Sequence, residues 1–337
     1  MRILVTGGAG YIGSVTVETL LAAGHHVAVL DDLSTGHRAA VPEGAQLWTA
    51  SYADGDAVER CVHEEAIEAV LHCAARSLVG ESVGDPARYY RENVAGGIAL
   101  LEALRRSGVL RMVFSSTAAV YGAPETTPIT EESPVRPINP YGETKRTFEG
   151  ALRWYGRAYG LRSVILRYFN AAGATERNGE QHAPETHLVP NILLAAQGRA
   201  GLTIFGEDYP TPDGTCIRDY IHVRDLAAAH LLALGASDPA DPRTGQREGP
   251  TEPLVCNLGS GAGFSVREVL ATAERIVGRP IPHRVGDRRP GDPPVLLASS
   301  ARARDVLGWR PAHESLEAMV GSAWAWRERH PDGYPEA

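Results

Sequence analysis

The chain has 337 residues, a formal net charge of −8 and a hydrophobic fraction of 43%. This length allows two domains of ordinary size, and the composition excludes a disordered or fibrous protein. The acidic balance without a basic stripe argues against a nucleic-acid partner. No apolar run reaches the roughly 20 residues that span a bilayer, and the N-terminus lacks the features of a signal peptide. We therefore expect a cytoplasmic protein without membrane contact.

The cysteines and histidines carry no recognisable metal pattern. The four cysteines lie far apart in the chain and form no CxxC pair, which is typical of reduced thiols in a cytoplasmic protein. We found no histidine cluster with the spacing of a zinc site. We therefore expect no metal.

Strand and helix signals alternate along the first half of the chain. Short apolar runs predict buried strands at residues 2–6, 27–30, 69–73, 112–115 and 163–169. Helical patterns follow the first strand up to residue 23 and recur at 89–104. This alternation predicts a parallel sheet with right-handed crossovers and helices on both faces. The expected fold class is α/β: a doubly wound Rossmann parallel sheet with a smaller α+β C-terminal substrate domain.

The alternation ends near Ala174, where polar segments and segments rich in proline and glycine begin. Helices are predicted to start after Thr186, near Val223 and near Ser265. We therefore predict a dinucleotide-binding domain over residues 1–174 and a substrate-binding domain over residues 175–337, with some elements exchanged between the two.

A glycine-rich segment joins the first predicted strand to the first helix. Its glycines satisfy both GxGxxG and GxxGxxG, through Gly7, Gly8, Gly10 and Gly13. Glycines let the backbone approach a pyrophosphate, and the helix N-terminus supplies N–H groups to it. Asp31 ends the next strand, 18 residues after Gly13, where a carboxylate binds ribose hydroxyls and repels a 2′-phosphate. The pattern predicts NAD as the cofactor, although His37 and Arg38 leave NADP as an alternative.

Only one of the 33 basic residues is a lysine, at position 145. It follows Tyr141 by four positions, so both side chains share one face of a helix that Asn139 and Pro140 would begin. A phenol has an unperturbed pKa near 10, and a nearby ammonium and a cationic nicotinamide both favour its ionised form. Only Tyr141 and Tyr220 have an arginine or lysine four positions later. A single lysine placed at random among the basic positions would rarely fall at this spacing from a tyrosine, which disfavours chance as the explanation. The pair predicts a tyrosine whose pKa is lowered by Lys145.

Upstream, Ser115, Ser116 and Thr117 close a predicted strand. At such a strand end a hydroxyl can form a hydrogen bond with a substrate.

These motifs together resemble the extended short-chain dehydrogenase/reductase family over nearly the whole chain. They are TGGAGYIGS at 6–14, DDLSTG at 31–36, LVGES at 78–82, FSSTAAVYG at 114–122, NPYGETK at 139–145, LRYFNAAGA at 166–174, IFGEDYPTPDGTCIRDYIHVRDLA at 204–227 and RRPGD at 288–292. Within the family, the chain is similar to enzymes that epimerise nucleotide sugars. The resemblance implies NAD-dependent C4 epimerisation of a UDP-hexose, from UDP-galactose to UDP-glucose, by a homodimer. The reaction would pass through a 4-keto intermediate, with hydride transfer to and from bound NAD.

The resemblance also implies roles for the residues at matching positions. Tyr141 would be the general base and acid, Lys145 its electrostatic partner and Thr117 the catalytic hydroxyl, with Ser116 as the alternative. The implied cofactor-binding residues are Gly7, Gly10, Tyr11, Ile12, Gly13, Asp31, Asn93, Tyr141, Lys145 and Tyr168. The implied substrate-binding residues are Thr117, Asn170, His187, Leu188, Phe205, Arg218, Tyr220, Arg289 and Asp292. The two arginines would pair with the pyrophosphate, whereas an ion pair between Arg289 and Asp292 is the alternative for those residues.

Three positions depart from the family pattern. Ala50-Ser51-Tyr52 replaces a Gly-Asp pair at the adenine-binding turn, and His187 replaces a substrate-side asparagine. Leu296 stands where one branch has tyrosine, which leaves room for a UDP-N-acetylglucosamine or UDP-pentose 4-epimerase as alternatives. Two other functions are disfavoured: a 4,6-dehydratase would carry acids where Ala118-Ala119 stands, and a non-catalytic NAD-sensing protein should lack the Tyr–Lys pair.

Overall fold

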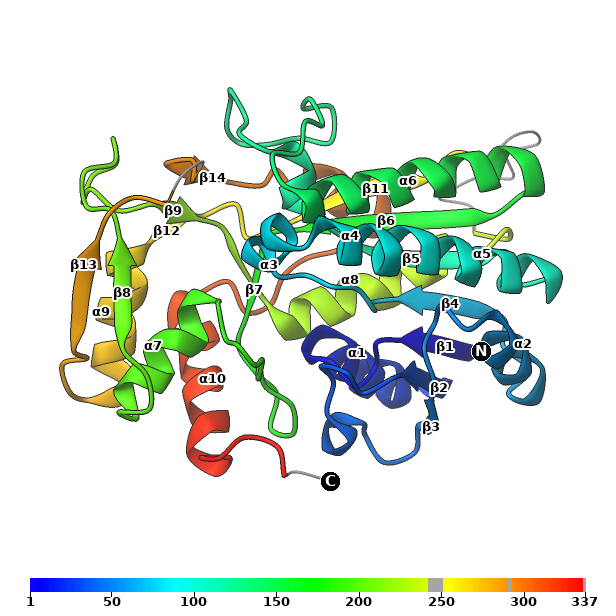
Figure 1. Ribbon diagram of the computed structural model, residues 1–337, viewed down its shortest axis with the longest axis horizontal. Helices are drawn as coiled ribbons and strands as arrows, with labels where there is room; N and C mark the ends of the chain where they lie inside the picture. Colours follow the sequence, from blue (N-terminus) through cyan, green and yellow to red (C-terminus); the bar gives the residue numbers. More distant parts are fainter. Residues whose placement is uncertain (242–250, 290–291, 336–337) are drawn as a thin grey trace.

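Seven parallel strands form the central sheet of the computed structural model, which describes residues 1–241, 251–289 and 292–335 (Figure 1). Their order is β11-β6-β5-β4-β1-β2-β3. The strands are β1 (Arg2–Thr6), β2 (His26–Asp31), β3 (Gln46–Thr49), β4 (Ala69–His72), β5 (Arg111–Thr117), β6 (Arg162–Tyr168) and β11 (Leu254–Leu258). This is the strand order of a doubly wound dinucleotide-binding sheet, and the predicted α/β fold class is confirmed.

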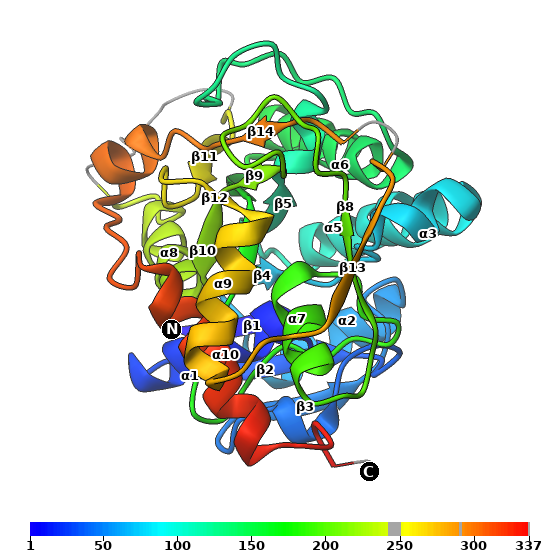
Figure 2. The same cartoon turned by 90° about the vertical axis from the view of Figure 1, so that its left-hand side faces the viewer.

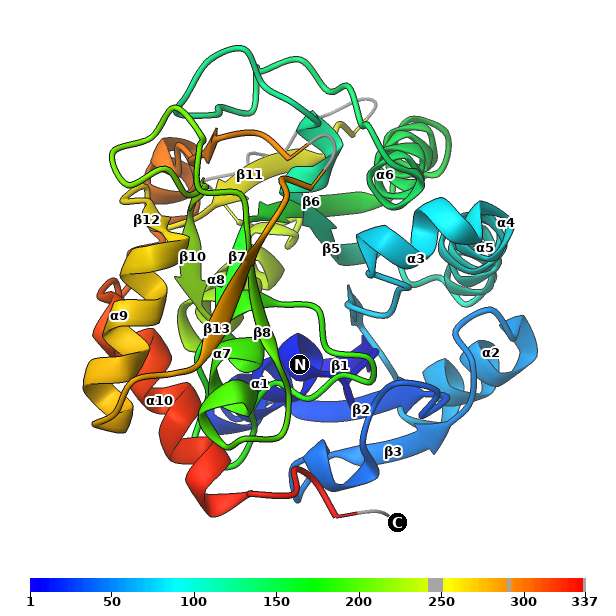
Figure 3. The ribbon, with the colours of Figure 1, turned by 60° about the vertical axis from the view of Figure 1, so that its left-hand side comes forward.

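Helices cover both faces of the sheet, as parallel strands require. One face packs against α1 (Tyr11–Ala22) and α8 (Val223–Ala236); the other packs against α2 (Gly55–Glu64), α5 (Gly97–Arg106) and α6 (Pro140–Tyr159) (Figure 3). Successive side chains of β1 point to opposite faces of the sheet, so this strand contributes to both layers. Ile3 and Val5 join the layer of α1 and α8, whereas Leu4 joins the layer of α2, α5 and α6.

The helix predicted at 89–104 is divided in the structure. It consists of α4 (Pro86–Tyr89), a π-helical segment η2 (Tyr90–Gly96) and α5. The π turn is wider than an α turn, but the backbone stays helical through it. The apolar periodicity of the sequence therefore does not distinguish the π-helical segment from an α-helix. The remaining short helices of this part are η1 (Arg38–Ala40), α3 (Val79–Gly84) and η3 (Ala118–Tyr121).

A smaller unit follows β7 (Asn170–Ala172), and Figure 2 shows it facing the viewer. Helices α7 (Leu188–Ala196), α9 (Val266–Val277) and α10 (Leu316–Arg329) pack around a separate apolar core. The other elements of this part are β8 (Leu202–Phe205), β9 (Ile217–Arg218), β10 (Tyr220–His222), β12 (Phe264–Ser265), β13 (His283–Gly286), β14 (Val295–Leu296) and η4 (Ala303–Leu307). The helices predicted after Thr186 and near Val223 and Ser265 are α7, α8 and α9.

Three elements from beyond residue 174 belong to the layers of the central sheet, and one of them is η4, whose Ala303 and Leu307 join the layer of α1 and α8. Helix α8 packs beside α1, and β11 pairs with β6, with Leu254 opposite Val164. The two halves of the chain are therefore interleaved. Among the described residues, no helix has the length and apolar character needed to cross a membrane.

Three histidines are buried in the fold. Burial lowers the pKa of His72 to about 3 and the pKa values of His222 and His230 to about 4. In the unfolded chain these rings bind protons near pH 6.5. The unfolded state therefore binds more protons as the pH falls below 6.5, and the fold loses stability in that direction.

We predict that His72→Asn lessens this acid sensitivity by about 1.4 kcal/mol per pH unit between about pH 6.5 and pH 4. An asparagine amide can keep a hydrogen bond to Thr6, whose hydroxyl lies 2.7 Å from Nδ1 of His72. Urea unfolding at a series of pH values measures the slope. The exposed His63→Asn variant serves as the control and should keep the slope of the wild type. A wild-type slope in His72→Asn would contradict the prediction.

Candidate active site

Four strand ends meet at one edge of the central sheet. Strands β1, β2, β5 and β6 end at Thr6, Asp31, Thr117 and Tyr168, and Thr117 lies directly beside Tyr168 in the strand register. Ligands bind at the carboxyl ends of the strands in sheets of this kind. The fold therefore brings the predicted cofactor loop and the predicted catalytic residues to the same edge.

The glycine-rich loop after β1 is closely packed. Gly7 has a φ of +73°, and a Cβ at that position would lie 2.5 Å from the backbone nitrogen of Ala74. A Cβ on Gly13 would overlap the carbonyl oxygen of Gly7. Both positions therefore require glycine. The loop leads into α1, whose first N–H groups have no intrahelical acceptors and whose positive dipole end can bind a phosphate.

Asp31 is held by the loop beside it. Its Oδ2 accepts a hydrogen bond from the backbone N–H of Ala9 at 3.0 Å, and its Oδ1 accepts one from Leu33 at 2.9 Å. Burial raises the pKa of Asp31 even though these hydrogen bonds act to lower it. A carboxylate has about four acceptor positions, so Asp31 can still accept bonds from ribose hydroxyls. The glycine turn and this acceptor fit NAD. At the turn where the family resemblance implies adenine contacts, the hydroxyl of Ser51 accepts a hydrogen bond from the backbone N–H of Ala53 at 3.2 Å.

Three other predicted cofactor residues are engaged with the protein itself. The hydroxyl of Tyr11 donates to the carbonyl of Gly173 at 2.6 Å, and the amide of Asn93 bonds the backbone of Arg76 at 2.8 and 3.0 Å. Ile12 packs into the apolar layer under α1. Tyr11 thus ties α1 to the segment that leads into the smaller unit, and Asn93 ties the loop after β4 to η2.

Tyr141 and Lys145 lie in the first turns of α6. Asn139 precedes this helix and its side chain accepts a hydrogen bond from the N–H of Gly142 at 2.8 Å, while Pro140 occupies the first turn. This is the helix start predicted from the sequence. Both Tyr141 and Lys145 are buried, at 8% and 4% exposure.

Lys145 is enclosed by the end of β5. Its Nζ donates to the carbonyl of Ser115 at 2.8 Å and lies 4.6 Å from the centre of the Phe114 ring. Burial lowers the pKa of Lys145 to about 8. Burial also raises the pKa of Tyr141 to about 12, although a hydrogen bond with Thr117 acts to lower it. Without NAD, desolvation of the phenol therefore dominates, and the prediction that Lys145 and the cationic nicotinamide favour the ionised form of Tyr141 stays a prediction.

The pleat of β5 separates the two candidate hydroxyls, since successive residues point to opposite faces. The side chain of Thr117 interacts with Tyr141 and accepts a hydrogen bond from the N–H of Ala119 at 3.1 Å. Ser116 is fully buried, and its hydroxyl donates to Oε1 of Glu149 at 2.6 Å. The geometry therefore favours Thr117 over Ser116 as the hydroxyl that serves Tyr141.

Tyr168 and Asn170 continue the same edge at the end of β6 and the start of β7. Burial raises the pKa of Tyr168 well above its ordinary value, and the groups that influence it include Tyr141 and Ser115. The side-chain amide of Asn170 donates to the carbonyl of Asp219 at 2.8 Å. Tyr168 thus belongs to the group around Tyr141, whereas Asn170 is bound to the segment between β9 and β10.

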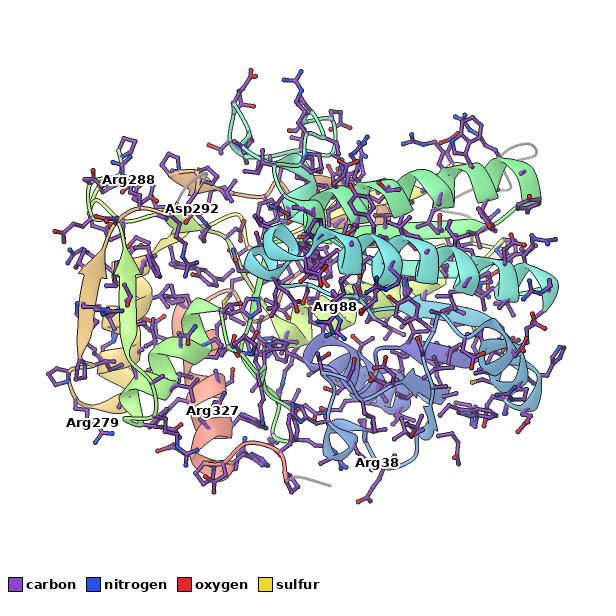
Figure 4. The ribbon with its side chains drawn as sticks, viewed as in Figure 1. Arg38, Arg88, Arg279, Arg288, Asp292 and Arg327 are labelled. Atoms are coloured by element: carbon purple, nitrogen blue, oxygen red, sulfur yellow. The ribbon has the colours of Figure 1, made fainter. Side chains whose placement is uncertain are left out.

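The predicted pyrophosphate and uridine residues form a second group on the smaller unit. Arg218 of β9 forms an ion pair with Asp292, which Figure 4 labels close to β14. The guanidinium of Arg289 lies 4.1 Å from the centre of the Phe205 ring. The alternative ion pair between Arg289 and Asp292 is therefore wrong, because Arg218 takes the carboxylate. Residues 290–291 of the RRPGD motif lie outside the described residues.

The other predicted substrate residues include Tyr220, which follows Arg218 by two positions, and two residues at the start of α7. Tyr220 is buried in the core of the smaller unit, and Leu188 begins α7 and packs against the same core. Nδ1 of His187 lies 2.8 Å from Glu180 and 3.1 Å from Glu185. The contacts of these side chains are thus with the protein itself.

A buried ion pair between α6 and β6 was not predicted from the sequence. Glu149 of α6 pairs with Arg167 of β6 at 2.6 Å, and both side chains are less than one-tenth exposed. Arg167 also donates to the hydroxyl of Tyr121 at 2.9 Å. Glu149 lies four positions after Lys145, so their shared helix face was the available signal.

Known proteins resemble this chain over nearly its whole length. Residues 3–244 match the sequence model of the NAD dependent epimerase/dehydratase family. A UDP-glucose 4-epimerase from Lacticaseibacillus casei is 48% identical over 337 residues, which is 99% of each chain. The structure of UDP-glucose 4-epimerase from Brucella ovis in complex with NAD is 45% identical, with a TM-score of 0.89 over 96% of this chain and 97% of that one. The enzyme of that name from Bifidobacterium longum, in complex with NAD⁺ and UDP, is 34% identical, with a TM-score of 0.90 over 99% of this chain and 100% of that one.

We predict that Glu149→Ala lowers the free energy of unfolding by about 3–5 kcal/mol, because it leaves the buried guanidinium of Arg167 without a counterion. Glu143→Ala is a matched control on the same helix. Glu143 also pairs with an arginine at 2.6 Å, but Arg146 is exposed, so the loss should stay below about 1 kcal/mol. Urea unfolding followed by circular dichroism measures both values. Equal losses in the two variants would contradict the prediction.

Proposed function

The chain belongs to the NAD dependent epimerase/dehydratase family, and we propose that it interconverts UDP-galactose and UDP-glucose by inverting C4 of the hexose. The observation that carries the proposal is the interaction between Thr117 and Tyr141 at the edge of the sheet where the glycine loop begins. The 48% identity to a UDP-glucose 4-epimerase from Lacticaseibacillus casei supports the same substrate pair.

We propose that the glycine loop, the first turn of α1 and Asp31 hold NAD, with Lys145 close to the nicotinamide ribose. Bound NAD supplies the hydride acceptor and donor for C4 and a positive charge that favours the ionised form of Tyr141. That charge matters because burial raises the pKa of Tyr141 to about 12. Lys145 adds a compact ammonium whose place is set by the carbonyl of Ser115.

Tyr141 is proposed to accept the proton of the C4 hydroxyl and to return it after the sugar has turned. The hydroxyl of Thr117 binds the C4 oxygen and holds it next to the phenol. General acid–base catalysis of this kind contributes about 100- to 10,000-fold to a rate. Ala118 and Ala119 follow Thr117 and offer no further proton donor, which favours epimerisation over elimination.

We propose that Arg218 and Arg289 bind the pyrophosphate of UDP, with Phe205 beside the uracil and Asp292 near the ribose. A guanidinium binds phosphate oxygens in a bidentate manner. The hexose would then turn about this anchor and present its opposite face to the hydride. In this proposal residues 1–174 bind NAD and residues 175–337 bind the UDP-sugar, although α8 and β11 of the second part pack into the first.

A 4-epimerase for UDP-N-acetylglucosamine or a UDP-pentose is the second candidate. Leu296 of β14 lies opposite Arg218 in the strand register, so its size affects the space beside the proposed pyrophosphate site. A leucine leaves more room than the tyrosine of one branch of the family. Turnover of UDP-galactose and UDP-N-acetylglucosamine by the same preparation distinguishes the two candidates.

We further propose a cytoplasmic homodimer that acts in galactose metabolism. All four cysteines are free thiols, which is the state that a reducing compartment maintains. Trp154 and Tyr159 on α6 are 65% and 48% exposed, and a second copy of the chain would cover them. Sedimentation velocity tests this assignment.

We predict that Tyr141→Phe lowers kcat on UDP-galactose by about 100- to 10,000-fold, because the ring remains but the proton acceptor is lost. Tyr90→Phe, an exposed tyrosine, is the control and should turn over like the wild type. NAD released on denaturation should be equal in the three proteins. Wild-type turnover in Tyr141→Phe would refute its role. A wild-type protein that cannot interconvert the two sugars with NAD would refute the substrate assignment.

We predict that Lys145→Arg lowers kcat by at least about 10-fold although it keeps the positive charge. The planar guanidinium does not fit the place of a compact ammonium bound to Ser115 and packed on Phe114. The exposed neighbour Arg146 allows the reverse change, and Arg146→Lys should keep the wild-type rate. Full activity in Lys145→Arg would show that charge alone is sufficient.

A further inference from the structure

Four side chains with metal-binding atoms meet in the segment between β7 and α7. They lie within eight positions of the chain, with the spacing E-x-H-x-x-E-x-H. One ligand atom of each lies within 4.8 Å of those of all the others, and the residues are Glu180, His182, Glu185 and His187. No cysteine takes part in this group.

Four distances between histidine nitrogens and carboxylate oxygens of this group are close to the ligand separations of a tetrahedral metal ion. Nδ1 of His182 lies 3.4 Å from Oε1 of Glu180 and 3.6 Å from Oε2 of Glu185. Nδ1 of His187 lies 2.8 Å from Oε1 of Glu180 and 3.1 Å from Oε1 of Glu185. A tetrahedral zinc ion with ligands at about 2.0–2.1 Å holds them about 3.3–3.4 Å apart. Small movements of the side chains would therefore complete such a site.

Two buried atoms of the cluster have no hydrogen-bond partner within the described ranges: Nδ1 of His182 and Oε2 of Glu185. The side chain of Glu185 is only 5% exposed. Its Oε1 accepts hydrogen bonds from the backbone N–H groups of Thr186 at 2.8 Å and His187 at 2.9 Å. These bonds fix the carboxylate, and Oε2 is the oxygen nearest to His182.

An ion pair alone accounts poorly for His182. A protonated imidazole normally brings its N–H within about 2.7–3.2 Å of an acceptor. The separations of 3.4 and 3.6 Å at His182 are too long for such a bond, but they suit two ligands on one ion. Buried polar atoms without partners are rare in folded proteins, so these two indicate a bound species.

We propose that Glu180, His182, Glu185 and His187 together bind one Zn²⁺ through two imidazole nitrogens and two carboxylate oxygens. Imidazole and carboxylate ligands suit zinc, and four protein ligands complete its tetrahedral coordination. The site is structural, because no position remains for water or substrate. The side chains of His182 and His187 are 23% and 44% exposed, which gives the ion access from solvent.

The zinc site would fix the segment that joins the two parts of the protein. Arg327 of α10 donates to the carbonyl of Glu180 at 3.1 Å, and Nε2 of His37, from the cofactor side, donates to the carbonyl of Gln181 at 3.2 Å. Helix α7 begins directly after His187. The ion would thus set where α7 starts. This inference rests on the four ligands and not on the proposed epimerase activity.

The test uses the full-length enzyme with its bound NAD, stripped of metal with EDTA and titrated with ZnCl₂ alone. We expect one Zn²⁺ per chain by elemental mass spectrometry, and CoCl₂ should produce the visible absorption of four-coordinate Co²⁺ at the same site. His182→Ala and Glu185→Gln should weaken binding at least about 100-fold, because even outer-shell partners contribute about 10- to 100-fold. His63→Ala, an exposed histidine of α2, should bind like the wild type.

Circular dichroism and bound NAD report whether each variant is folded, and Glu185→Gln keeps the size of the side chain. If the wild type binds no more Zn²⁺ than His182→Ala, the proposal is overturned and the cluster is a set of histidine–glutamate ion pairs. Equal affinity in all variants would overturn it as well, by identifying adventitious surface binding. Turnover of UDP-galactose is measured on the same samples, so a failure of the epimerase assignment is seen separately from a failure of metal binding.

Discussion

A buried ion pair between Glu149 and Arg167 holds helix α6 against the central sheet, and the position of Tyr141 depends on it. Two charges are stable in an interior only when further hydrogen bonds satisfy them. Ser116 of β5 and Tyr121 of η3 provide those bonds. Because α6 is fixed near its middle, Tyr141 in its first turn is held at the ends of β5 and β6. The same helix therefore covers the sheet and presents the phenol.

The strands and helices with a clear apolar pattern were predicted from the sequence, and those without one were not. β1 matches its predicted range of 2–6, whereas the edge strand β3 was missed because Gln46–Thr49 has no buried residue. The π-helical turn at Tyr90–Gly96 preserves the helical pattern and so leaves no trace in it. β11 was missed for another reason: its partner β6 lies some ninety residues earlier, and nothing local encodes that pairing.

The parts of the site that are close in sequence were also the predictable ones. The glycine loop and the pair Tyr141 and Lys145 are short motifs with a direct chemical meaning. The pKa of Tyr141 could not be predicted, because desolvation depends on what the fold packs around the phenol. Nor could the partner of Arg218, since Asp292 lies 74 positions away. The choice between neighbouring hydroxyls on β5 needed the pleat of the strand and the position of α6.

The last strand of the central sheet leaves the ribosome long after its partner. β6 ends at Tyr168, but β11 is complete only when Leu258 has been synthesised. Until then β6 presents an unpaired edge, and such edges associate with strands of other chains. Parallel pairing across this separation is also slow to form. The nascent chain is therefore most prone to aggregation late in translation, when strands β1 to β6 are already made and the sheet is still open.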